Sequence, residues 1–292
     1  MELLIVLLIA FLPFIVIFSA IAVIAKSLHK RSRVPFEYSD MIRIPAFTLI
    51  QNQRDETFNM LQWTFMSAIY FQLPFSIPTL ARLLGFESKI GQWWLYAGIF
   101  SIVAVYALVK AVQAFTKLRN IRLGIEAEWA VSYALSKITD PNVRVFHDIQ
   151  GPNFNIDHVV TYPGGVLAIE TKGRRKPNIK NSRQTHKVVV QGNEIQFPHG
   201  PDTSIIEQAT RQATWLSKEL SKSTGMEVIT SPLVVIPGWF IENKQKPTVP
   251  VMNHKSLTKY YSLTKKTILN NSALERINHQ IEQLAMRRSD EL

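Results

Sequence analysis

Two carboxylates and a lysine occupy adjoining stretches that are rich in β-branched and other apolar residues, as β-strands are. The stretches are NIDHVVTY and GVLAIETK, and Pro163 and Gly164 separate them. A two-residue turn there would form a hairpin that pairs Asp157 with Glu170, with Cβ atoms about 4.5–5.5 Å apart. Lys172 would share their face, because side chains alternate along a strand. The opposite face is expected to hold core residues: Ile156, Val160, Leu167 and Ile169.

This trio could bind a divalent cation and cleave a phosphodiester bond. Buried carboxylates are costly unless they are paired or bind a metal, and two facing carboxylates also repel each other. Mg²⁺ relieves both costs, because it prefers carboxylate oxygens and water as ligands, and Mn²⁺ can replace it. The cation also makes water more acidic, and Lys172 could orient that water or stabilise charge on the phosphate. A simple Asp–Lys or Glu–Lys ion pair on a solvated strand is the alternative.

Several motifs surround the hairpin: Gly124 with Glu128, Ile156-Asp157-His158-Val159-Val160, Gly165-Val166, Ile169-Glu170-Thr171-Lys172, and Gln208-Ala209. Together they resemble the core of the nuclease-related domain family, NERD, which belongs to the PD-(D/E)XK nuclease superfamily. The resemblance covers roughly residues 120–236. It implies a restriction-endonuclease-like fold, metal binding by Asp157 and Glu170, and catalysis by Lys172.

The sequence departs from the family pattern in two places. After the lysine the family commonly has Asn and an aromatic-Ser-Gly run, and here Gly173-Arg174-Arg175-Lys176 follows instead. The usual Asn-Pro before the Gln is also replaced, by a run that ends in Ile206-Glu207. These differences bear on the substrate more than on the metal site.

Two helical residues could complete the site. Glu128 lies near the apolar stripe of the first helix of this region, whereas Glu126 points away from it. Glu128 is therefore the candidate third metal ligand, although an acid near a helix N-terminus also complements the helix dipole. Gln208 borders the apolar side of a later helix. The resemblance suggests that it bonds to the site or to a phosphate, and an amide at the edge of the core is the alternative.

A basic stretch without any acid follows the hairpin and is a candidate nucleic-acid-binding loop. Lys and Arg residues neutralise backbone phosphates, so a basic loop beside a nuclease site favours phosphate contact. An anionic lipid surface is the competing partner. The residues expected to bind are Arg174, Arg175, Lys176, Lys180 and Arg183.

The remaining pattern indicates an α/β or α+β domain in which helices flank one central mixed sheet. The chain has a net charge of +11 and no cysteine, so disulfides, thiolate metal sites and cysteine nucleophiles are excluded. The expected elements are a helix from Gly124, strands in VRVFHDI and SPLVVIP, a hairpin around Gly192-Asn193, and helices at 204–220 and 268–288.

The first third of the chain is predicted to contain membrane-spanning helices. Residues 3–25 and 93–110 are apolar and long enough to span a bilayer, and residues 60–80 are a third candidate that holds Pro74 and Pro78. We therefore predict a membrane region at 1–114 with two or three helices and a nuclease-like domain at 115–292. Lys and Arg follow the first and last spans, which predicts that the C-terminal domain of a multi-pass plasma or inner membrane protein faces the cytoplasm.

The sequence thus favours a membrane-anchored, Mg²⁺-dependent nuclease that acts on nucleic acid, with DNA as the expected polymer. A second hypothesis is an inactive module that holds nucleic acid or a partner at the membrane. A third is a membrane component of a larger complex, such as a defence complex, in which the polar residues Gln62 and Gln72 support helix packing.

Overall fold

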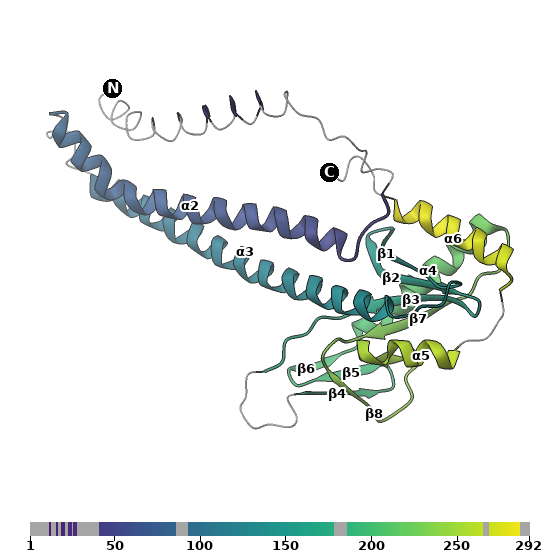
Figure 1. Ribbon diagram of the computed structural model, residues 1–292. Coiled ribbons are helices and arrows are strands. Elements are labelled where there is room, and N and C mark those ends of the chain that lie inside the picture. Colours follow the sequence, from purple (N-terminus) through teal and green to yellow (C-terminus); the bar gives the residue numbers. More distant parts are fainter. Residues whose placement is uncertain are drawn as a thin grey trace. The chain divides into compact units, whose positions relative to one another are not determined.

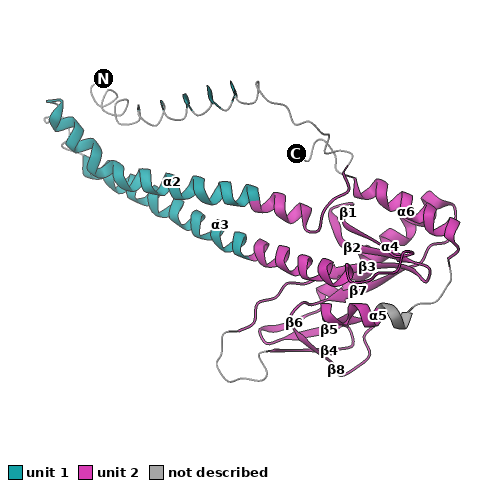
Figure 2. Ribbon diagram, viewed as in Figure 1, with its two compact units in different colours: residues 1–37, 54–119 teal, residues 38–53, 120–292 magenta. Residues whose placement is uncertain are grey.

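The computed structural model describes residues 41–85, 93–177, 186–264 and 269–286, together with a few positions between 12 and 27. The chain divides into two compact units (Figure 2). One comprises residues 1–37 and 54–119, and the other comprises residues 38–53 and 120–292. Residues 38–53, which precede and begin the first long helix, therefore belong to the same unit as the hairpin. The predicted boundary near residue 114 stays a prediction.

The first unit is built from two long helices, α2 (Phe47–Leu83) and α3 (Trp93–Leu135), whose ends continue into the second unit. Within the described residues, α3 is the one helix long and apolar enough to cross a membrane, and an 18-residue window of it has a mean hydropathy of 2.0. The predicted span at 60–80 is helical throughout and contains both of its prolines. The predicted span at 3–25 lies mostly outside the described residues.

The helix that we predicted to begin at Gly124 is the end of α3, which starts about thirty residues earlier and is not interrupted. The physical reason is the intervening sequence KAVQAFTKLRNIRL, which contains no proline and is rich in residues that favour helices. The apolar stretch at Trp93 and the predicted metal ligand Glu128 are thus parts of one helix.

Five strands form the main sheet of the second unit, in the order β1-β2-β3-β7-β9. The first four of them are labelled in Figure 1. The first three are antiparallel, and β7 and β9 continue the sheet in parallel to β3. Their bounds are β1 (Arg144–Gly151), β2 (Phe154–Tyr162), β3 (Gly165–Thr171), β7 (Thr230–Val235) and β9 (Val251–Met252).

A second sheet of four strands, in the order β6-β5-β4-β8, corrects the prediction of one sheet. The predicted hairpin around Gly192 is present as β4 and β5, but β6 and β8 extend it into a separate sheet. Strands of three and four residues are too short to show an alternating pattern, so β6 and β8 could not be predicted from periodicity. Their bounds are β4 (Lys187–Gln191), β5 (Glu194–Phe197), β6 (Gly200–Asp202) and β8 (Phe240–Asn243).

Helices cover both faces of the main sheet. On one face, α4 (Ser204–Thr224) and α6 (Asn271–Ala285) pack their apolar sides on β1, β2 and β3. A 3-10 turn at His254–Ser256 leads into α5 (Leu257–Thr264). On the other face, the end of α3 and the first residue of α5, Leu257, contact β2, β3 and β7. The start of α4 also packs on the second sheet. The hairpin is therefore buried on both sides.

One predicted core assignment was wrong. Val160, Leu167 and Ile169 share a face, as predicted, but Ile156 packs in the opposite cluster with the residues under α4 and α6. The cause is a distortion of β1 at Asp148, whose φ of 54° lies in the left-handed region and interrupts the regular alternation between the strands.

Candidate active site

The hairpin of β2 and β3 has the register predicted from its turn. His158 pairs with Ile169, so Asp157 and Glu170 occupy the next positions of the two strands. The backbone N–H of Thr171 donates to Oδ2 of Asp157 at 2.6 Å. Asp157 is 8% exposed and Glu170 is 2% exposed. The structure therefore brings both predicted carboxylates together in a nearly dry position.

Glu170 is held from two sides. Its Oε1 forms an ion pair with Nζ of Lys172 at 2.7 Å, and its Oε2 accepts a hydrogen bond from Nε2 of Gln212 at 2.7 Å. Lys172 also donates to Oε1 of Gln208 at 3.0 Å. The Lys172 side chain keeps 25% of its surface exposed. A cation that is fixed by two partners and still reachable from solvent can meet an incoming phosphate.

Glu128 enters the cluster from α3. It is 4% exposed, while Glu126 is exposed on the other side of the helix, as predicted. The backbone of Ala46 provides one hydrogen bond to Glu128. Its Oε2 atom is buried and has no hydrogen-bond partner among the described residues. A buried carboxylate oxygen without a donor is a position where a cation is favourable.

The carboxylates influence one another electrostatically. Burial, followed by the nearby Asp148 and Glu170 charges, raises the pKa of Glu128 from 4.5 to about 8. Burial also raises the pKa of Asp157 well above its ordinary value, and the charges of Glu170 and Glu128 add to this effect. The Lys172 ammonium opposes the rise in both pKa values. These groups share one region of negative potential in which ionisation is unfavourable without a compensating cation.

The donor set fits a hard divalent cation. Three carboxylates supply oxygen ligands, which is the chemistry that Mg²⁺ and Mn²⁺ require, and no thiol is present in the chain. Across the described residues, no three His, Asp or Glu side chains are already gathered closely enough to enclose an ion. Glu128, Asp157 and Glu170 would hold the cation after a local rearrangement of their side chains.

The neighbouring histidines, His147 and His158, bond to each other. Nδ1 of His147 and Nδ1 of His158 share a hydrogen bond of 2.8 Å across β1 and β2, and His158 is fully buried. Burial lowers the pKa of both imidazoles, and that of His147 falls to about 4. Both rings therefore stay neutral and bonded to each other.

Gln212 borders the apolar side of the same helix as Gln208 and has no role assigned from the sequence, but its side chain contacts the candidate site. It is 1% exposed, and its Nε2 donates both to Glu170 and to the backbone oxygen of Asn155, at 2.9 Å. Its spacing of four residues from Gln208 puts both amides on one face of α4. This spacing could have predicted the role of Gln212, because two amides on one face of a helix, beside its apolar stripe, are expected to bind neighbouring polar groups.

A comparison with protein families assigns this region. The family model described as the nuclease-related domain, NERD, matches residues 123–237. The chain carries a NERD domain. The match includes Glu128, the hairpin and the whole of α4 with both glutamines, and it ends shortly after β7. No curated protein and no solved structure matches the chain.

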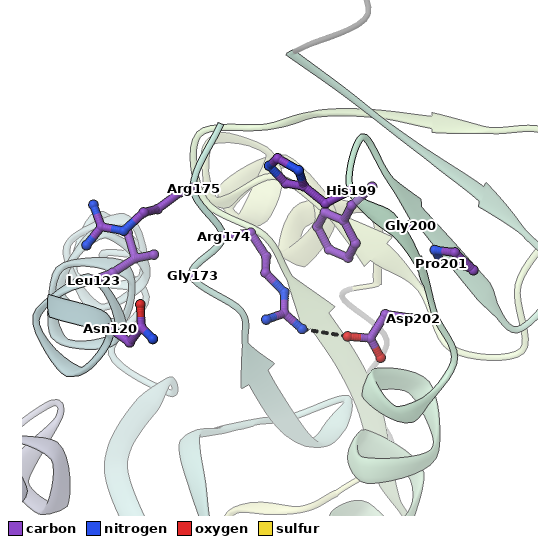
Figure 3. Close-up of a pocket in the computed structure, with 10 residues that line it drawn as sticks. Asn120, Leu123, Gly173, Arg174, Arg175, His199, Gly200, Pro201 and Asp202 are labelled. Carbon is purple, nitrogen blue, oxygen red and sulfur yellow. Dashed lines mark hydrogen bonds and ion pairs between the residues drawn. The ribbon is translucent and has the colours of Figure 1, made fainter. Parts of the chain in front are cut away.

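A cavity of about 590 Å³ opens next to the hairpin of the NERD domain (Figure 3). It lies between α3 and the second sheet and begins at Gly173, directly after Lys172. A Cβ atom added at Gly173 would lie 2.9 Å from the backbone oxygen of Leu123 on α3. Because glycine has no side chain, the segment after β3 can lie this close to α3. The other lining residues include Asn120, Arg174, Arg175, Phe197, His199 and Asp202.

Of the predicted basic residues, Arg174 and Arg175 line this cavity, and Lys176 follows Arg175 in the chain. Arg174 is not free to bind a phosphate, because its guanidinium pairs with Asp202 at 2.5 Å and lies over the Phe197 ring. The ammonium of Lys176 is 5.5 Å from the centre of the Trp239 ring. Two further predicted residues, Lys180 and Arg183, lie outside the described residues.

Proposed function

We propose that this protein is a membrane-anchored, divalent-metal-dependent nuclease that hydrolyses phosphodiester bonds of nucleic acid, with DNA as the polymer. One observation carries the proposal. Inside a NERD domain, the buried carboxylates of Glu128, Asp157 and Glu170 share one region of negative potential, beside a fixed and accessible lysine. This arrangement combines a cation-binding cluster with a group that can meet an anionic substrate.

Each residue has a distinct proposed task. Glu128, Asp157 and Glu170 bind the cation, which when bound supplies Lewis acidity and acidifies water for attack on phosphorus. Lys172 presents an ammonium group to the phosphate and stabilises the negative charge that grows there. Gln208 and Gln212 keep Lys172 and Glu170 in place through the hydrogen bonds described above.

The cavity beside the hairpin is the proposed path of the nucleic acid. Arg175 and Lys176 follow β3 and would contact backbone phosphates, with Lys180 and Arg183 as further proposed contacts. Arg174 would join them only when its pair with Asp202 opens.

The membrane assignment rests on the apolar part of α3 and on the sequence before it. α3 is long and apolar enough for one span, which supports a membrane-bound protein. We propose a multi-pass arrangement in the plasma or inner membrane with the NERD domain in the cytoplasm, because Lys and Arg are concentrated after residues 25 and 109.

An inactive nucleic-acid-binding module is a second candidate. It is favoured by the ion pair between Glu170 and Lys172, which already satisfies both groups, and by the lack of a ready metal-ligand cluster in the described parts of the chain. Such a module would bind nucleic acid in the presence or absence of Mg²⁺ and would leave it intact.

The test uses the full-length protein in detergent micelles with labelled single-stranded DNA, double-stranded DNA and RNA. Cleavage should require Mg²⁺ or Mn²⁺ and stop with EDTA. Asp157→Asn, Glu170→Gln and Lys172→Ala should each abolish it. Thermal stabilisation by Mg²⁺ should vanish in the two carboxylate variants and persist in the lysine variant, because its ligands remain. Cleavage that survives in all three variants would refute the nuclease site, and binding without cleavage by the wild type would favour the inactive module.

A further inference from the structure

A fourth buried carboxylate, Asp148 on β1, lies outside the set that would bind the cation. It is fully buried and forms an ion pair with Nη1 of Arg43 at 3.1 Å, where the Arg43 side chain is 2% exposed. Arg43 also donates to the backbone oxygen of Asp148 at 3.3 Å, and Thr48 donates to its Oδ2 at 2.7 Å. Both partners come from the segment that precedes and begins α2, more than ninety residues earlier in the chain.

The backbone of Asp148 is as unusual as its side chain. Its φ of 54° is left-handed, and Asp148 is missing from the pairing of β1 with β2, although His147 and Ile149 on either side are paired. Asp adopts this conformation more readily than most residues, but it is maintained only where the surroundings determine it. Here Arg43 and Thr48 supply those surroundings.

A series of hydrogen bonds leads from Asp148 to the proposed catalytic Glu170. Oδ1 of Asp148 accepts from Nδ2 of Asn155 at 2.8 Å. The backbone oxygen of Asn155 accepts from Gln212, and the same Gln212 nitrogen donates to Glu170. Asn155 also lies two residues before Asp157 on β2. Each contact in this series is formed within the second compact unit.

We propose that Asp148 is a positioning residue that sets the place of Glu170 and Asp157 for cation binding, and that Arg43 and Thr48 are part of the active unit although they precede the NERD domain. This role rests on the proposed metal-dependent function. Partners that orient metal ligands commonly change metal affinity by 10- to 100-fold when they are mutated. Asp148 does not contact the cation in this role: it acts through Asn155 and Gln212, and its charge also reaches the proposed ligand Glu128.

The test measures Mn²⁺ binding by calorimetry on the full-length protein in micelles, so that it does not depend on cleavage. Asp148→Asn removes the buried charge, and Asn155→Ala removes the contact that follows it. Both variants should bind Mn²⁺ 10- to 100-fold more weakly than the wild type. If Asp148→Asn does not fold, Asn155→Ala decides the matter, because Asp148 keeps Arg43 and Thr48 in that variant.

Thr161→Val is the matched control. Thr161 is also buried on β2 and donates to Asn278 at 2.5 Å, so the variant loses one buried hydrogen bond that does not lead to the site. It should melt at a lower temperature and bind Mn²⁺ with wild-type affinity. If the Asp148 and Asn155 variants bind Mn²⁺ as the wild type does, the positioning role is wrong and the proposed function stands. If the wild type binds no Mn²⁺, the metal-dependent function fails and the positioning role fails with it.

Discussion

Replacing Glu128 by glutamine should stabilise the protein when no metal is present. The folded state holds Glu128 in a buried position where its pKa is about 8, whereas an unfolded chain would ionise it with a pKa near 4.5. Glutamine has the shape of the protonated acid and can still accept the hydrogen bond from Ala46, but it never ionises. The variant therefore avoids the free-energy cost of either carrying a buried charge or retaining a proton.

The size and sign of this effect follow from the two pKa values. Between pH 4.5 and 8 the folded protein keeps a proton on Glu128 that the unfolded chain has lost, so wild-type stability falls as the pH rises. One pKa unit corresponds to about 1.4 kcal/mol, which gives a cost on the order of 3 to 5 kcal/mol at pH 8 and little at pH 5. For a unit of this size the melting temperature should differ by on the order of 10 °C at pH 8.

The assay is thermal unfolding in EDTA at several pH values, with the wild type, Glu128→Gln and Glu126→Gln. Glu126 lies on the same helix but is exposed, so its variant should follow the wild type throughout. The gain of Glu128→Gln should grow steadily from pH 5 to pH 8. A gain that is absent, or that is the same at every pH, would show that Glu128 is not a strained buried acid.

Three further results are expected. Gly173→Ala should destabilise the domain by about 1–3 kcal/mol in denaturant unfolding, because its methyl group would press on the Leu123 backbone, and an unchanged midpoint would show that this approach is loose. Replacing Arg175 and Lys176 by alanine should weaken DNA binding and reduce its dependence on salt by up to about one unit of slope per lost phosphate contact. An unchanged slope would place the loop elsewhere, as at a lipid surface. A reporter fused after Leu292 should be active in the cytoplasm, and activity only outside it would reverse the proposed orientation.

Local patterns were sufficient to predict most of the elements around the hairpin. Both strands are short runs of mostly apolar residues joined by a short turn, so the pairing of β2 with β3 followed from the sequence. The helical periods that predicted α4 and α6 are equally clear, because each helix has one apolar face against the main sheet. The helical period also distinguished Glu128 from Glu126, because side chains two residues apart on a helix point in different directions.

Distant contacts could not be predicted in this way. β8 pairs with β4 across about fifty residues, and neither strand is long enough to show which sheet it joins. The pair of Arg43 with Asp148 joins a segment that reads as a membrane-proximal loop to a strand 105 residues later. Asp148 also distorts β1 opposite Asp157 of β2. As a result, Ile156 of β2 packs on the face opposite to the one that regular alternation predicts. The roles of the site residues themselves remain predictions.

The contact between Arg43 and the end of α6 also has a consequence for biosynthesis. The Arg43 backbone donates to the oxygen of Ala285 at 2.9 Å, and Ile42 bridges to Met286, so the segment that fixes Asp148 is itself fixed by the last helix. During translation this segment emerges early and must wait for α6 before its backbone is paired. A nascent or prematurely terminated chain that contains the whole NERD domain but lacks α6 would have an incompletely supported site. We expect the proposed cleavage activity only from chains that include α6.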